Sequence, residues 1–184
     1  TGFRMNVDGR KGSSFNNVGI LANDSMYVFV EVTVDPNGGN QPLLIQDSVL
    51  FTVNGIRQSV LLEAYGQDVN LYKGGVTITK DSILTANRPY LIYDSLVIAK
   101  GVSLNIEKGA TFYMHDKASL IVHGSMNALG TLDEPITFRG DRLDYILNDI
   151  LPYDRTPGQW GGITFKADSY GNVWDNVIVR NGTS

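Results

Sequence analysis

The hydrophobic pattern in the second half of the chain has two periods. Short segments alternate between apolar and variable residues, and this alternation recurs after 22 to 24 residues. The segments begin at Leu96, Leu104 and Phe112, and again at Leu120, Met126 and Ile136. Alternation with a period of two is typical of a half-buried β-strand. Its return at a nearly constant spacing predicts a solenoid, in which each turn of chain stacks on the turn before.

This stacking assigns a set of apolar side chains to the interior. They are Leu96, Ile98, Leu104, Ile106, Phe112, Met114, Leu120, Val122, Met126, Ala128, Ile136 and Phe138. The expected stacks are Leu96 on Leu120, Leu104 on Met126, and Met114 on Phe138. Glycines lie between the segments, where the chain has to turn a corner.

The first 70 residues have the strand pattern of an antiparallel β domain. Residues 26–34 alternate strictly, which places one methionine and four valines on one face of a strand. Two further alternating runs flank the pair Asn54-Gly55, and Asn-Gly in this position is a strong signal for a β-hairpin. Short strands joined by such turns predict an immunoglobulin-like β-sandwich, complete or incomplete, over residues 1–70.

The pattern also predicts the boundaries within the rest of the chain. Residues 71–89 are expected to be a connector, because a glycine pair and Pro89 interrupt the alternation. The solenoid is then expected over residues 90–184. Within it, residues 139–159 break the repeat and are expected to form an inserted loop. Long loops in compact domains are usually functional or disordered.

Composition restricts the possible functions. The formal net charge is −4 and the basic residues form no cluster, so we expect no binding of nucleic acid, which needs a basic surface. The absence of cysteine excludes disulfides and thiolate metal sites. No apolar run approaches the length of a transmembrane helix. Because both ends of the sequence adjoin strand-like segments, we expect a fragment. A signal, a lipid anchor or more β-structure is expected to have been lost at its N-terminus, and further turns at its C-terminus.

Several motifs resemble the opening turns of right-handed parallel β-helix proteins. They span residues 104–109, 120–124, 127–131, 134–138 and 160–163. The chain is similar in these motifs to secreted and surface-anchored proteins of Bacteroidetes, in which an immunoglobulin-like module precedes the β-helix. The resemblance covers residues 76–184 well and the first 70 residues loosely. It implies an extracytoplasmic location: secreted, in the outer membrane or on the bacterial cell surface.

The insertion holds the candidate ligand-binding residues. They are Asp141, Arg142, Asp144, Tyr145, Asp149, Tyr153, Asp154, Arg155 and, where the repeat resumes, Trp160. Aromatic rings stack on sugar faces, while carboxylates and guanidinium groups bond hydroxyls. The spacing of the aspartates matches no calcium loop, and we expect neither a metal nor a cofactor. The alternative is a structural flap with solvated charges, in which Trp160 packs against the return of the insertion.

Three further motifs have an ordinary structural interpretation beside a functional one. Residues 139–141 spell Arg-Gly-Asp, an integrin-binding tripeptide, but its glycine also suits a turn. His115 and His123 are expected at strand ends, as surface or stacking residues rather than metal ligands or general bases. Asn23 and Asn181 begin formal N-glycosylation sequons, which carry little meaning in a bacterial protein.

The outward positions of the expected solenoid favour one class of function over another. Enzymes of this fold that cut acidic polysaccharide need carboxylates, or Ca²⁺ with a basic residue, along one outer face. The outward residues Asn105, Asn127, Thr137 and Thr164 are neutral. We therefore expect a non-enzymatic surface or secreted scaffold or binding module that contacts polysaccharide or a surface protein. The alternative is part of a carbohydrate-active β-helix enzyme, a polysaccharide lyase or hydrolase. No catalytic residue is assigned.

Overall fold

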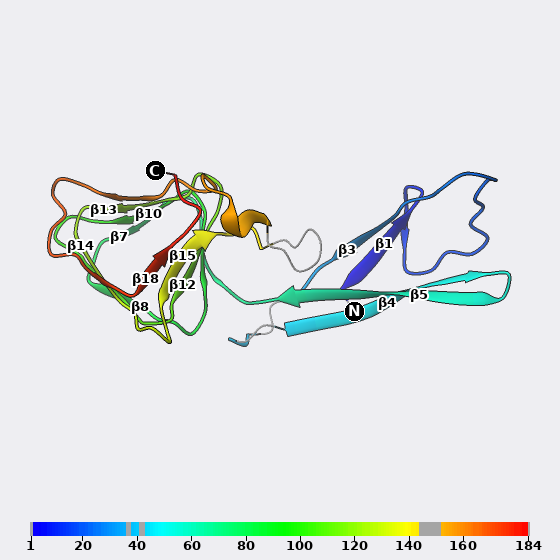
Figure 1. The fold of residues 1–184 in the computed structure, drawn as a ribbon, viewed down its shortest axis with the longest axis horizontal. Helices are drawn as coiled ribbons and strands as arrows, with labels where there is room; N and C mark the ends of the chain where they lie inside the picture. The colour runs from blue at the N-terminus through cyan, green and yellow to red at the C-terminus, as the bar shows by residue number, and fades with distance from the viewer. Residues whose placement is uncertain (1, 36–37, 41–42, 144–151, 184) are drawn as a thin grey trace. The chain divides into compact units, whose positions relative to one another are not determined.

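The protein is built from β-strands in two units. The computed structural model describes residues 2–35, 38–40, 43–143 and 152–183. Unit 1 is Thr1–Asp68 and unit 2 is Val69–Ser184. The described residues contain one short 3₁₀ helix and no α-helix, which confirms the prediction of an all-β chain (Figure 1). In the same residues, no helix is long and apolar enough to cross a membrane.

Unit 1 contains two antiparallel sheets. Its strands are β1 (Phe3–Val7), β2 (Arg10–Gly12), β3 (Val28–Val32), β4 (Leu43–Val53) and β5 (Ile56–Gly66). One sheet has the order β2-β1-β3, and the other is the β4–β5 hairpin. Asn54 and Gly55 form the hairpin turn with φ values of 51° and 80°, as the sequence predicts. Of the unit's described apolar residues, Val7 and Val49 are the buried ones, so a sandwich around a shared core is not confirmed.

Unit 2 is a coil in which each turn contributes one strand to each of three parallel sheets. The sheet orders are β7-β10-β13-β16, β8-β11-β14-β17 and β6-β9-β12-β15-β18. Strands that are three apart along the chain pair in parallel, so one turn lies directly on the previous one (Figure 1). This arrangement fits a parallel β-helix or solenoid, as the repeat in the sequence predicts.

The strands of the coil are short and evenly distributed. They are β6 (Asn70–Tyr72), β7 (Val76–Ile78), β8 (Ser82–Leu84), β9 (Tyr90–Ile92), β10 (Ser95–Ile98), β11 (Ser103–Ile106), β12 (Thr111–Met114), β13 (Ser119–Val122), β14 (Ser125–Leu129), β15 (Ile136–Gly140), β16 (Ile163–Phe165), β17 (Val173–Asp175) and β18 (Val177–Val179). The 3₁₀ helix η1 (Pro152–Arg155) lies between β15 and β16. The insertion therefore leaves the coil at the corner between the third sheet and the first.

The coil begins earlier than the sequence suggests. Residues 71–89, expected to be a connector, carry β7 and β8 and pair with the next turn. In β7, Val76 and Ile78 take interior positions in register with β10. In β8, Ser82 stands at an interior register while Ile83 faces outward and is 64% exposed. In β8 the polar residue therefore takes the interior position and the apolar residue the outward one. For this reason the sequence of β8 does not show the alternation by which the other strands are recognised.

The expected interior is confirmed residue by residue. Each of the twelve side chains assigned to it is at most 5% exposed. Leu96 pairs with Leu120 and Leu104 pairs with Met126, both as predicted. Because these side chains point into the coil from all three sheets, burial of their apolar surface is the main force that holds the turns together.

The register of the third sheet differs from the prediction. Phe112 pairs with Phe138, and Met114 pairs with Gly140. The predicted stack of Met114 on Phe138 is therefore wrong. The corner before β15 is longer than the corner before β12, which moves the paired residues along the strand. At Gly140 the side chain of Gln159, from the end of the insertion, occupies the space that a larger residue would fill.

An aromatic column runs through the interior of the coil along the third sheet. Ring centroids are separated by 4.9 Å between Tyr90 and Phe112, and by 4.5 Å between Phe112 and Phe138. Tyr72 meets Tyr90 edge-on at 5.8 Å, and Trp174, from β17 in the second sheet, stacks against the other end of the column with its centroid 6.0 Å from that of Phe138. Burial and the neighbouring Tyr90 raise the pKa of Tyr72. Aromatic stacking favours the observed register over one that would place Met114 on Phe138.

The last described turn begins after the insertion. Ile163 and Phe165 repeat the spacing of Ile136 and Phe138 in the sequence, but the strand that holds them, β16, pairs with β13. Residues 173–179 form two strands, β17 and β18. The insertion ends at a corner, so the chain re-enters the coil in the next sheet.

Candidate functional site

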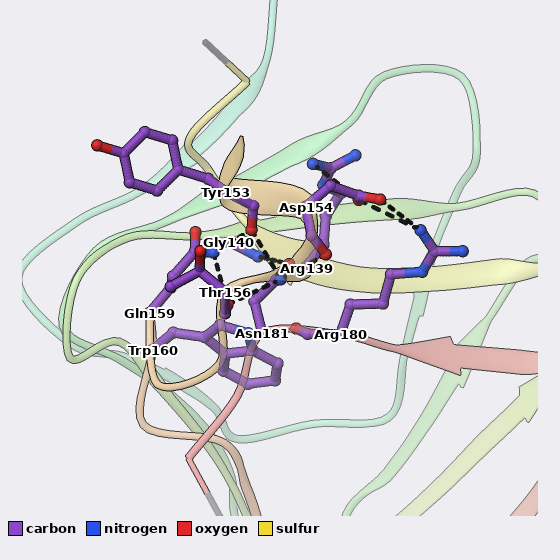
Figure 2. A network of polar contacts seen from close by, with 9 residues as sticks. All are labelled: Arg139, Gly140, Tyr153, Asp154, Thr156, Gln159, Trp160, Arg180 and Asn181. Atoms are coloured by element: carbon purple, nitrogen blue, oxygen red, sulfur yellow. Dashed lines mark hydrogen bonds and ion pairs between the residues drawn. The ribbon is translucent and has the colours of Figure 1, made fainter. Parts of the chain in front are cut away.

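The described part of the insertion is held against the coil by a carboxylate between two arginines (Figure 2). Asp154 Oδ1 lies 3.4 Å from Arg139 Nη2, and Asp154 Oδ2 lies 3.1 Å from Arg180 Nη1. Arg139 and Arg180 follow the paired residues Phe138 and Val179, so they belong to successive turns. The Asp154 contacts are charge-assisted, the stronger kind of hydrogen bond. One side chain of η1 therefore binds two turns of the coil.

Two amide side chains complete this attachment. Asn181 Nδ2 lies 3.0 Å from the carbonyl oxygens of Tyr153 and Asp154 and 3.1 Å from that of Thr156. Gln159 Nε2 donates to the carbonyls of Tyr153 and Thr156, the latter at 2.8 Å. The last carbonyls of a helix have no partner within the helix and need outside donors. Asn181 and Gln159 supply these donors to η1, as Figure 2 shows.

Trp160 belongs to the core rather than to the surface. Its side chain is 1% exposed, and its indole Nε1 donates to the carbonyl of Arg180 at 2.7 Å. Its backbone forms a parallel bridge with Gly182. This placement agrees with the interpretation that Trp160 packs against the return of the insertion, and it leaves no ring face for a sugar in this structure.

Three of the predicted ligand-binding residues face solvent at least in part. The guanidinium carbon of Arg142 lies 4.1 Å from the ring centroid of Tyr153, a cation–π distance. Arg142 and Arg155 are exposed and Tyr153 is half-buried. The ring of Tyr153 points away from the polar network in Figure 2. We call Arg142, Tyr153 and Arg155 the arginine–tyrosine face.

The other predicted residues of the insertion are divided between two situations. Asp141 is bonded to His115, and Asp154 forms ion pairs with Arg139 and Arg180. Asp144, Tyr145 and Asp149 lie outside the described residues. The binding role of the whole set stays a prediction.

Asp141 belongs to a column of side chains at one corner of the coil. Asp141 Oδ2 lies 2.6 Å from His115 Nδ1, and the His115 ring lies 4.1 Å from the Tyr93 ring between centroids. Lys73 Nζ lies 5.6 Å from the Tyr93 ring centroid. These four residues come from four successive turns. His115 thus stacks as predicted, and its bond to Asp141 fixes the point where the insertion begins.

A second histidine–aspartate pair holds the loop between β16 and β17. His123 Nδ1 lies 3.0 Å from Asp168 Oδ1. Desolvation alone would raise the pKa of Asp168. The net effect is a lowered pKa, because Asp168 accepts hydrogen bonds from His123 and from its own backbone and lies near the charges of His123 and Lys100. Ser169 Oγ donates to the carbonyl of Gly124 at 2.8 Å in the same loop. Sequence analysis missed Asp168 because nothing in its neighbourhood indicates which histidine it will meet.

The Arg-Gly-Asp tripeptide is not displayed on a free loop. It spans the end of β15, where the Arg139 side chain is 17% exposed and bonded to Asp154. Its Asp141 is bonded to His115. Both charged side chains are therefore engaged within the protein. Among the described residues, no group of three or more histidines and carboxylates lies close enough together to hold a metal ion.

Comparisons with known proteins give one similarity of limited extent. No family model matches the chain, and no solved structure matches it. The chain is similar to Protein bark beetle of Drosophila melanogaster, with 31% identity over 104 residues, which is 54% of this chain. The chain spans about 3% of the length of that curated relative. The fold therefore places the protein among all-β chains with stacked parallel strands, and the similarity concerns a short part of a much longer protein.

Proposed function

We propose that the chain is a non-enzymatic scaffold or binding module of a cell-surface or secreted protein. In this proposal an immunoglobulin-like module precedes a right-handed parallel β-helix, as in the Bacteroidetes proteins that the sequence resembles. The alternating strands and Asn-Gly hairpin of unit 1 support the first part. Parallel strands joined by crossover connections are right-handed in nearly all proteins, which supports the handedness. The proposed location is extracytoplasmic: secreted, in the outer membrane or on the bacterial cell surface.

The observation that carries the proposal is the fixed arginine–tyrosine face. Asp154 and Asn181 hold η1 against two turns of the coil, so Tyr153 is positioned before any ligand arrives. Preorganised contacts cost less conformational entropy on binding. A tyrosine ring offers a face to a sugar, and arginines bond its hydroxyl or carboxylate groups. We therefore propose polysaccharide as the ligand class, and a surface protein as the alternative partner.

The outer surface of the coil supports a scaffold rather than an enzyme. Asn105 and Asn127 pair on successive turns, and Asn127 Nδ2 donates to Asn105 Oδ1 at 3.1 Å. Thr111 and Thr137 form a second neutral pair on the third sheet. Neutral side chains that bond to one another stabilise the stacking of the coil but transfer no protons at neutral pH.

A glycan array tests the proposal directly. The chain and the variants Arg142→Ala and Tyr153→Ala are compared at equal concentration, with Arg57→Ala as a control that removes an exposed arginine from unit 1. The proposal predicts binding that falls at least about tenfold in the first two variants and is unchanged in the control, the scale of one lost stacking or charged contact. Binding that survives both substitutions at full strength contradicts the assigned face.

The enzyme alternative has one observation in its favour. His115 is oriented by Asp141 through Nδ1, the arrangement that prepares an imidazole to act as a general base. This alternative predicts release of unsaturated oligosaccharide from pectin or alginate, and loss of that release in His115→Gln. The non-enzymatic proposal predicts no release by either protein.

A further inference from the structure

The column of side chains beside the start of the insertion follows the turns of the coil in register. It comes directly after four positions that pair in succession in the third sheet: Tyr72, Ile92, Met114 and Gly140. Its own members, which we call the corner column, are Lys73, Tyr93, His115 and Asp141. The backbone N–H groups of Tyr93, His115 and Asp141 donate to carbonyls of the preceding turn at 2.8 to 3.1 Å. The corner column therefore advances by one strand spacing, about 4.8 Å, from each residue to the next.

Contacts within the corner column fix its rings and leave polar atoms for a ligand. The Tyr93 ring centroid lies 4.1 Å from that of His115 and 5.6 Å from Lys73 Nζ, so the hydroxyl is the group that Tyr93 can offer. Asp141 engages His115 Nδ1 at 2.6 Å, and Nε2 is the ring nitrogen that remains. The His115 side chain is 43% exposed, and Lys73 is exposed as well. Each turn thus presents one hydrogen-bonding group, and rings that are already stacked lose little freedom when a ligand binds.

The charges around the corner column balance. The described segments 73–75, 93–94, 115–118 and 141–142 hold as many cationic side chains as carboxylates: Lys73, Lys117 and Arg142 against Asp94, Asp116 and Asp141. A surface that attracts a polyanion has an excess of positive charge. A neutral polymer rich in hydroxyl groups instead needs both donors and acceptors, which lysine, tyrosine, histidine and aspartate supply together. The composition of this corner therefore favours a neutral polysaccharide.

The corner column continues directly into the arginine–tyrosine face. Asp141 ends the column and is followed in the chain by Arg142, whose guanidinium carbon lies 4.1 Å from the Tyr153 ring centroid. In an extended β-1,4-linked polysaccharide, each sugar advances by a length close to one strand spacing. Successive sugars can therefore meet successive turns of the coil.

We propose that the corner column is a second part of the binding site and takes a neutral, β-1,4-linked polysaccharide. The bound chain runs along the axis of the coil, from the arginine–tyrosine face to Lys73. Its hydroxyl groups bond in turn to the Asp141 carboxylate, His115 Nε2, the Tyr93 hydroxyl and Lys73 Nζ. This inference rests on the proposed function, in which the arginine–tyrosine face holds the first sugars.

Isothermal titration calorimetry with cello- and xylo-oligosaccharides of two to six units tests the inference. The affinity of the parent should rise with each added sugar as further turns are reached. Tyr93→Phe keeps the stacked ring and removes the hydroxyl, and Lys73→Ala removes the group farthest from the insertion. Both should weaken binding of the six-unit sugars by about three- to tenfold, the scale of one lost hydrogen bond, and leave binding of the disaccharides unchanged. Lys80→Ala, which removes an exposed lysine from the next corner of the same turn, is the control and should match the parent.

Thermal unfolding of each variant shows whether the fold is intact, and the exposed Lys73 keeps the test valid if Tyr93→Phe is unstable. Six-unit sugars that bind no tighter than disaccharides, or equally well to the parent, Lys73→Ala and Tyr93→Phe, overturn the corner column as a site. Binding that Tyr153→Ala still removes then leaves the proposed function standing. Binding of other glycans on the array, but of neither oligosaccharide series, overturns the ligand class proposed for the column. The proposed polysaccharide binding itself fails if no glycan on the array binds, and the corner column fails with it.

Discussion

Single side chains decide how the insertion is attached to the coil. Asn181 combines a left-handed backbone, with φ of 64°, with an amide that reaches three carbonyls of the insertion. Few residue types do both, because glycine accepts the backbone but has no amide. The sequence shows Asn181 only as the start of a sequon, since its partners lie 25 to 28 residues away in the chain.

Replacing Asn181 separates these two roles. Asn181→Asp keeps the shape but turns the donor into an acceptor facing carbonyl oxygens, and we expect the free energy of unfolding to fall by about 1–3 kcal/mol. Asn181→Gly keeps the backbone conformation and removes the amide, so its loss should be smaller. Urea denaturation followed by circular dichroism measures both. Equal stability of the aspartate variant and the parent would show that these hydrogen bonds do not hold the insertion.

Asp168 makes stability depend on pH in the acid range. Its pKa is lower in the folded protein than its ordinary value, mainly because of the hydrogen bond from His123 once desolvation is overcome. A lowered folded pKa contributes stability above the unfolded pKa of about 4, and this contribution disappears as pH falls through the folded pKa. The parent should therefore exceed Asp168→Asn in unfolding free energy at neutral pH, and the difference should shrink on acidification.

Urea titrations of the two proteins at several pH values check this expectation. Asp133→Asn, a change at an exposed aspartate in the corner before β15, serves as the control. A difference between the parent and Asp168→Asn that stays constant from neutral to acid pH would rule out the proposed linkage.

At the scale of elements, the aromatic column connects four turns of the third sheet. Phe112 lies between Tyr90 and Phe138, stacked on both. We expect Phe112→Ala to cost about 3–5 kcal/mol of unfolding free energy, because a fully buried ring leaves a cavity. Phe112→Leu fills much of that space and should cost less.

Thermal and urea unfolding of both variants give the comparison. Near-ultraviolet circular dichroism, which reports on the packing of the column, should change in both, since each loses the stacked ring. If Phe112→Ala loses less than about 1 kcal/mol, the ring does not occupy a fixed place in a close-packed core.

The elements of the coil differ in how well the sequence predicts them. β10 to β14 follow from alternation alone, because each has apolar residues at both interior positions. β8 is not predicted, because Ser82 stands at an interior position and Ile83 at an outward one, the reverse of the usual alternation. The register of β15 is not predicted either, because it depends on the length of the corner that precedes the strand. Alternation reports which way a side chain points, whereas corner lengths decide which residues of two turns meet. The contacts of Asp154 and Asp168 depend on side-chain direction and on corner length together. Their partners, the two arginines and His123, could therefore not be predicted from the sequence.

At the scale of the whole molecule, the buried apolar residues are concentrated in unit 2. The core cluster extends from Ile78 to Trp160 and lies entirely within the coil. In unit 1, the β4–β5 hairpin has 11 residues in each strand and many exposed apolar side chains. An isolated two-stranded hairpin is marginally stable in water. The two units should therefore differ strongly in local stability.

Hydrogen exchange on the full chain measures this difference. Amide protons of β10 to β15 should be the most protected, and those around the Asn54-Gly55 turn the least, because local opening there exposes little buried surface. Equal protection of the hairpin and the coil would contradict the expected difference in local stability between the two units.

Direct stacking of successive turns is the central claim, and an engineered disulfide tests it. The chain has no native cysteine, so a pair can be introduced without competition. Asn105 and Asn127 are paired on neighbouring parallel strands, about 4.8 Å apart, within the range that a disulfide spans. Val173 stands one strand beyond Asn127 and hence about 10 Å from Asn105, outside that range.

Oxidation followed by peptide mass spectrometry under non-reducing conditions gives the result. The double variant Asn105→Cys with Asn127→Cys should form an intramolecular disulfide in nearly all molecules, and Asn105→Cys with Val173→Cys should remain reduced. A free dithiol in the first variant, or equal bond formation in both, would contradict the stacked parallel coil.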